Sequence, residues 1–85
     1  MPKTVFTGAH QHVVEILTNA RKEAGLTQAQ LGNRIGRDQS FISLIEGAQR
    51  RVDILEFFAL AKALGYEPLD LVNRLLRRLD GNFEI

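Results

Sequence analysis

The segment that most constrains the fold is residues 25–46, where two short amphipathic stretches are separated by only three residues. In residues 28–35, Leu31 and Ile35 are four positions apart; in residues 39–46, Ile42 and Ile45 are three apart. This spacing predicts two helices with one apolar stripe each. Helices this short are not stable alone in water. The pair must therefore pack onto the rest of the chain.

The three residues between these stretches, Gly36-Arg37-Asp38, have the chemistry of a tight turn between helices. Gly36 can adopt the left-handed conformation that ends a helix. Asp38 can accept hydrogen bonds from the free N–H groups that begin the next helix, as an N-cap. Thr27 is suited to the same role at the start of the first stretch.

Composition limits the chain to one small domain of 85 residues, with 45% hydrophobic and 25% charged residues. Such a balance is typical of a globular protein. The chain has no cysteine, which excludes disulfides and thiolate metal sites. The N-terminus lacks a signal-peptide core, and the most apolar stretch, residues 54–66, is too short to cross a bilayer. We therefore expect a soluble cytoplasmic domain that is not associated with a membrane.

The net charge of +1 is unevenly distributed. Residues 1–52 hold seven Lys/Arg and four Asp/Glu, a balance of +3, whereas residues 53–85 hold four and six, a balance of −2. This asymmetry is compatible with one face that meets phosphates, but many ordinary domains also have it.

Three further helices are predicted outside the central pair. One runs from about residue 10 to 24; a second follows Asp53, which can form a capping box with Glu56; a third begins near Pro68, a residue suited to a first helical turn. The second carries the largest apolar set, which includes Ile54, Phe57, Phe58, Ala61 and Leu64. We thus expect an all-α domain of five helices over residues 10–80. Residues 1–9 would form an N-terminal arm and residues 81–85 a tail, and residues 4–6 and 82–85 could each be a short strand.

Three short segments of the sequence match a known family: RKEAGLTQ at 21–28, ISLIE at 42–46 and LAKALG at 60–65. With them, residues 14–72 resemble the Cro/CI-type helix-turn-helix domain of phage repressors and of the bacterial XRE family. The resemblance implies a compact five-helix lambda-repressor-like bundle that binds double-stranded DNA. Residues 39–46 would enter the major groove, and residues 28–35 would lie across the DNA backbone. The sequence departs from the family pattern at Gly32, Arg37, Ala48 and Val52.

Candidate base contacts lie at the start of the second helix of the pair. Gln39 can pair with the adenine edge, and Ser40 and Ser43 can donate or accept at several bases. Leu44 can contact only a thymine methyl group. The alternative is that the glutamine and the two serines are ordinary surface residues.

Candidate contacts to the DNA backbone surround this helix. Gln28 matches the family position that reaches a phosphate and braces the first glutamine of the recognition helix. Phe41 either lies against the sugar-phosphate rim or covers the preceding helix. Arg50 and Arg51 either clamp phosphate oxygens or are a solvated pair of charges. The full set of expected backbone contacts is Thr27, Gln28, Arg37, Phe41, Gln49, Arg50 and Arg51.

The remaining polar residues are assigned structural roles. The resemblance implies that Arg21 and Glu46 form an ion pair between the first and third helices. His10 and His12 are two residues apart, and no further ligand lies nearby in sequence, so we interpret them as capping or surface residues rather than metal ligands. The chain has no nucleophile–base pattern and no glycine-rich phosphate loop. We therefore expect neither a metal, a cofactor nor an enzymatic activity.

The last helix has more apolar positions than one face needs. We expect it to form a homodimer interface with the residues Leu71, Leu75, Leu76 and Leu79. The sequence thus predicts a bacterial or phage-encoded DNA-binding transcriptional regulator, a dimeric repressor that reads a palindromic operator. The alternative from another class is an antitoxin-like module that binds a second protein and regulates its own expression.

Overall fold

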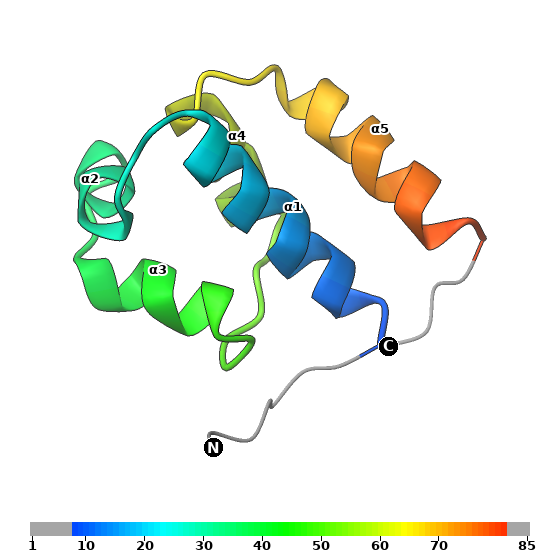
Figure 1. Cartoon of the computed structure of the whole chain (residues 1–85), viewed down its shortest axis with the longest axis horizontal. Helices are drawn as coiled ribbons and strands as arrows, with labels where there is room; N and C mark the ends of the chain where they lie inside the picture. The colour runs from blue at the N-terminus through cyan, green and yellow to red at the C-terminus, as the bar shows by residue number, and fades with distance from the viewer. Residues whose placement is uncertain (1–7, 82–85) are drawn as a thin grey trace.

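The computed structural model describes residues 8–81 of the chain (Figure 1). Within this range it contains five helices and no strand, which confirms the predicted all-α class. The helices are α1 (His10–Glu23), α2 (Gln28–Arg34), α3 (Gln39–Glu46), α4 (Ile54–Ala63) and α5 (Pro68–Leu79). Most of the expected arm and tail, and both candidate strands, lie outside the described residues.

Side-chain caps define where the helices begin. Thr27 accepts a hydrogen bond from the backbone N–H of Gln30, whose side chain accepts one in return, and Asp53 and Glu56 form the same capping box at α4. Asp38 caps α3 by accepting a hydrogen bond from the N–H of Phe41 at 3.2 Å. These interactions are local, which is why the sequence predicted them.

The turn between α2 and α3 is tight enough to restrict two glycines. Gly36 has a φ of +71°, a conformation that costs a non-glycine residue energy. At Gly32, a Cβ atom would lie 2.8 Å from the carbonyl oxygen of Arg37. The departure from the family pattern at Gly32 thus leaves room for the turn to fold back over α2.

The core lies where α1 meets the other helices. α1 runs through the centre of the molecule, with α3 on one side and α5 on the other (Figure 1). Its buried residues belong to one cluster that also includes residues of the four other helices. The core comprises Ile16, Leu17, Ala20, Leu31, Ile42, Ile45, Phe57, Leu60, Ala61, Leu64 and Leu71.

The expectation that Leu71 lies at a dimer interface is wrong. It is 0% exposed inside the monomer and has no surface to offer a second copy. Leu75 is half-buried and packs against the same core. Ile54 and Phe58, which belong to the largest apolar set of the sequence, are 62% and 38% exposed. They lie at the edge of the apolar stripe whose centre is formed by the buried residues Phe57, Leu60 and Ala61. The sequence does not reveal this exposure, because helical periodicity does not show how wide the buried stripe is.

None of the helices within residues 8–81 is both long and apolar enough to cross a bilayer.

Candidate nucleic-acid interface

The outer face of α3 presents the four candidate base-contact residues to solvent. Gln39, Ser40, Ser43 and Leu44 are exposed, whereas Ile42 and Ile45 on the opposite side of the helix are buried. This division follows from the packing of the apolar stripe on α1 and α2. The four side chains therefore share one accessible surface.

The two serines have their hydroxyl protons engaged within the helix. The Ser40 hydroxyl donates to the Asp38 carboxylate at 2.6 Å, and the Ser43 hydroxyl donates to the carbonyl of Ser40 at 3.2 Å. The first of these hydrogen bonds is the main cause that lowers the pKa of Asp38. Because both hydroxyl protons are used in these hydrogen bonds, the Ser40 and Ser43 hydroxyl oxygens can only accept a hydrogen bond from DNA. Such acceptors suit the amino groups of adenine or cytosine.

A chain of hydrogen bonds runs from Gln39 to the interior. The Gln39 amide donates to the side-chain oxygen of Gln28 at 3.3 Å, and the Gln28 amide donates to Glu46 at 3.0 Å. Glu46 also accepts from Arg21, at 2.7 Å from Nε and 2.9 Å from Nη2. The expected ion pair between Arg21 and Glu46 is thus present, and its side chains are only 12% and 10% exposed.

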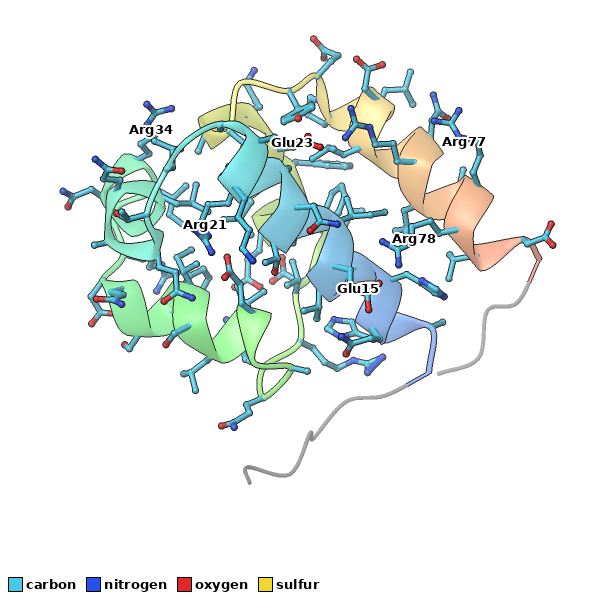
Figure 2. All side chains as sticks on the ribbon, in the orientation of Figure 1. Glu15, Arg21, Glu23, Arg34, Arg77 and Arg78 are labelled. Carbon is cyan, nitrogen blue, oxygen red and sulfur yellow. The ribbon has the colours of Figure 1, made fainter. Side chains whose placement is uncertain are left out.

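Arg21 ties this chain to the helix that crosses the core. Its third contact is a donation from Nη1 to the carbonyl of Leu26 at 2.7 Å, in the loop between α1 and α2. Figure 2 shows Arg21 reaching from α1 towards the α2–α3 pair. The hydrogen bond to Glu46 raises the pKa of Arg21. Through Arg21, α1 therefore fixes Glu46 of α3, which in turn accepts the hydrogen bond from Gln28 of α2.

Phe41 lies between two arginine side chains. The guanidinium carbon of Arg37 is 5.0 Å from its ring centre, and that of Arg50 is 4.5 Å away, both within the range of cation–π attraction. The ring is half-buried and packs against the core. The Phe41 side chain therefore organises the cationic rim beside α3.

Arg50 has a partner that the sequence analysis missed. Its Nη1 and Nη2 donate to the two carboxylate oxygens of Glu56 at 2.9 and 2.7 Å, and Nη1 also donates to the carbonyl of Arg51. The only sequence signal was the Asp53–Glu56 capping box, which gave no hint of a second role for Glu56. Arg50 thus links the loop after α3 to α4, and its guanidinium is already neutralised.

The other candidate backbone contacts flank α3. Thr27 is exposed and its hydroxyl oxygen serves as the cap of α2. Gln49 and Arg51 are exposed in the turn after α3. Ala48 in that turn has a φ of +58° and is buried, so the left-handed position falls on Ala48 rather than on the preceding glycine.

The pair formed by Arg50 and Glu56 predicts a pH dependence of stability. The Arg50 side chain and the backbone N–H of Asp53 lower the pKa of Glu56 to about 2. A carboxyl group whose pKa falls on folding stabilises the protein above its unfolded pKa, and this contribution is lost as the pH falls. We expect the free energy of unfolding to decrease between about pH 4.5 and pH 2, and the decrease to be smaller in Glu56→Gln.

Urea unfolding across this pH range measures the effect. The lowered pKa values of Glu15 and Asp38 act in the same direction, so the difference between the variant and the unmutated protein is the informative quantity. Identical pH profiles for the two proteins would contradict this role of Glu56.

The two histidines differ from each other. His10 is buried, and its Nε2 accepts a hydrogen bond from the backbone N–H of Val52 at 3.4 Å. Burial is the main cause that lowers the pKa of His10. The expectation of a surface residue is therefore wrong for His10, which joins the start of α1 to the loop after α3. Within residues 8–81, no group of three or more potential metal-ligating side chains occurs.

Comparison with known proteins places the chain in a family. The helix-turn-helix family model matches residues 17–71. The uncharacterized HTH-type transcriptional regulator y4dJ of Sinorhizobium fredii (strain NBRC 101917 / NGR234) is 36% identical over 52 residues, which cover 61% of this chain and 68% of that protein.

Solved structures give the same result. An XRE-family like protein from Pseudomonas syringae pv. tomato str. DC3000 superposes with a TM-score of 0.77 at 38% identity, covering 82% of this chain and 85% of that one. The restriction-modification controller protein C.AhdI from Aeromonas hydrophila has a TM-score of 0.64 at 33% identity, with coverages of 71% and 91%. The controller protein C.Esp1396I, solved as a tetramer with its 35 base-pair operator, has a TM-score of 0.79 at 23% identity, with coverages of 87% and 97%, and shares the fold. The chain therefore belongs to the XRE family of helix-turn-helix transcription regulators.

Proposed function

We propose that this protein is a dimeric, sequence-specific repressor that reads the DNA major groove with α3. The observation that carries the proposal is the hydrogen-bonded chain from Gln39 through Gln28 and Glu46 to Arg21. A side chain held in this way loses less conformational freedom when it pairs with a base. Family membership and the similarity to y4dJ, which is named as an HTH-type transcriptional regulator, support a role in transcription.

Gln39 is the residue from which we expect the largest loss of specificity. Gln39→Ala should weaken binding to the cognate site by about 1–3 kcal/mol and relax the preference at one base pair in each half-site. The measurement is selection of bound DNA from a random pool, followed by titration of the selected and scrambled duplexes. Equal weakening on both duplexes would contradict a base contact. A palindromic consensus would support binding as a two-fold symmetric dimer.

The backbone contacts would come from the rim around α3. We assign them to Thr27, Gln28, Arg37, Gln49 and Arg51. Arg50 is already paired with Glu56, so we assign it no phosphate. Instead, Arg50 and the Phe41 ring, which contacts both guanidinium groups, would position Arg37 for its phosphate contact. A phosphate contact orients the protein on the duplex without reading sequence.

A dimer interface is expected because one recognition helix contacts too few base pairs to select a single site in a genome. Such domains place two helices about one DNA turn apart. α4 and α5 pack together, and both helices expose large apolar side chains to solvent. These are Ile54, Leu55, Phe58, Leu69 and Leu76. We propose that a second copy covers this face, with Leu76 retained from the expected interface and Leu79, which is half-buried, at its edge.

Leu76 provides the test of the dimer. It is 49% exposed, so Leu76→Glu should leave the helical fold intact and shift the protein from dimer to monomer, because a charge cannot be buried unpaired. Sedimentation velocity at several concentrations measures the shift. Lys22→Gln on α1 changes the net charge by the same amount and should remain dimeric. If the unmutated protein is monomeric at high micromolar concentration, the exposed face serves a different partner, as an antitoxin-like module would require.

A further inference from the structure

Asp38 accepts two hydrogen bonds at the start of α3, and both reach the same carboxylate oxygen. Oδ1 accepts from the backbone N–H of Phe41 at 3.2 Å, which caps the helix, and from the hydroxyl of Ser40 at 2.6 Å. Capping needs only the first of these bonds. The second joins Asp38, to which we assign no DNA contact, to a side chain proposed to contact a base. Asp38 and Ser40 are both exposed, so the pair is accessible to DNA.

The direction of the hydrogen bond between Asp38 and Ser40 follows from the charge of Asp38. The Ser40 hydroxyl and then the Phe41 N–H are the main causes that lower the pKa of Asp38, so its carboxyl group is ionised at neutral pH. An ionised carboxylate can only accept, whereas a serine hydroxyl has one proton and two lone pairs. The Ser40 proton is therefore directed at Asp38. A hydrogen bond to a charged acceptor is about twice as strong as one between neutral groups, so Ser40 does not readily give it up to a base.

A serine whose proton is engaged reads fewer bases than a free serine. In the major groove, adenine N6 and cytosine N4 are amino groups, whereas guanine O6, thymine O4 and the purine N7 atoms are acceptors. A free hydroxyl can rotate to donate to any of these acceptors. The Ser40 oxygen can only receive an amino group. A base acceptor at the same place would meet the lone pairs of Ser40 and the carboxylate of Asp38 with no proton between them, which is unfavourable.

We propose that Asp38 is a specificity-determining residue that acts through Ser40 and selects an adenine or cytosine amino group at one base pair. Asp38 itself would contact no base. The inference rests on the proposed function, since it requires Ser40 to face the major groove. Ser43 provides a contrast, because its hydroxyl donates to the main-chain carbonyl of Ser40 at 3.2 Å. No side chain controls that bond, so the base preference at Ser43 should be independent of Asp38.

Deletion of a single amino group from the DNA tests what Ser40 reads. The relevant base pair is the position of the selected consensus at which Ser40→Ala abolishes the preference. Purine in place of adenine, or a pyrimidinone in place of cytosine, removes only the amino group at that position. The unmutated protein should bind this duplex roughly fivefold more weakly, as expected for the loss of one hydrogen bond. Ser40→Ala should bind the two duplexes equally.

Asp38→Gly tests the role of Asp38, because glycine is tolerated at an N-cap and leaves the Ser40 hydroxyl free. The freed hydroxyl can donate as well as accept, so this variant should bind duplexes with the other base pairs at that position more tightly than the unmutated protein does. The preference should approach equal affinity, whereas loss of a purely structural role would weaken all duplexes alike. The preference at the position read by Ser43 should not change.

Asp38→Asn is the matched control. It removes the same charge but keeps an oxygen that can accept from both Phe41 and Ser40. It should therefore keep the preference of the unmutated protein, while the loss of a negative charge beside the phosphates strengthens binding to every duplex.

The proposal is overturned if deletion of the amino group does not weaken binding, or if no position of the consensus depends on Ser40. It is equally overturned if Asp38→Gly keeps the preference, or if Asp38→Asn loses it as fully as Asp38→Gly does. Each of these results leaves sequence-specific binding by α3 intact. A random pool that yields no enriched sequence would overturn the proposed function together with this proposal.

Discussion

Leu71→Ala is expected to destabilise the protein by about 2–5 kcal/mol. Leu71 has 0% exposure and lies in the core where α5 meets α1 and α4. Truncation removes buried methyl groups and leaves a cavity that the rigid helices around it cannot fully close. A domain of this size is stable by only roughly 4–13 kcal/mol. The variant should therefore be partly unfolded at moderate temperature, as measured by urea unfolding followed by circular dichroism.

Leu76→Ala is the matched control on the same helix. Leu76 is 49% exposed, so the same truncation should change the unfolding free energy of the monomer by less than about 1 kcal/mol. Comparison at protein concentrations below those that support a dimer keeps association from contributing. If both variants were destabilised equally, the burial of Leu71 in the monomer would not account for its contribution to the free energy of unfolding.

Glu46→Ala is expected to cost about 2–4 kcal/mol of stability and to reduce discrimination between DNA sequences. Removal of one partner from a largely buried ion pair leaves the other charge uncompensated. Arg21, whose side chain is 12% exposed, would keep only its contact with Leu26. Gln28 would also lose its acceptor and hold Gln39 less firmly. Chemical denaturation measures the first effect, and titration of selected and scrambled duplexes measures the second.

A double-mutant cycle separates the ion pair from simple loss of side chains. Arg21→Ala combined with Glu46→Ala should cost less than the sum of the two single variants, because no charge is left buried without a partner. Additive costs would show that the pair is not energetically coupled. Glu46→Gln is the conservative comparison, since its amide oxygen can still accept from Gln28.

Local chemistry made the helices and the caps predictable. Asp38, Thr27 and the Asp53–Glu56 pair interact with N–H groups within three residues in sequence, so their roles do not depend on how the helices pack. The segments that match the family likewise implied the ion pair between Arg21 and Glu46. The predicted helix bounds 10–24 and 28–35 each differ from the structure by one residue at the C-terminal end, where a helix has no side-chain cap to mark it.

The sequence by itself therefore determined five helices, the tight turn at residues 36–38 and the exposed face of α3. The tertiary structure alone decided which leucines of α5 are buried, because Leu71 and Leu76 have the same chemistry and differ only in the helices that face them. It also decided that Arg50 pairs with Glu56. Burial and long-range charge pairing depend on the directions in which helices pack, and periodicity along one helix carries no information about its neighbours.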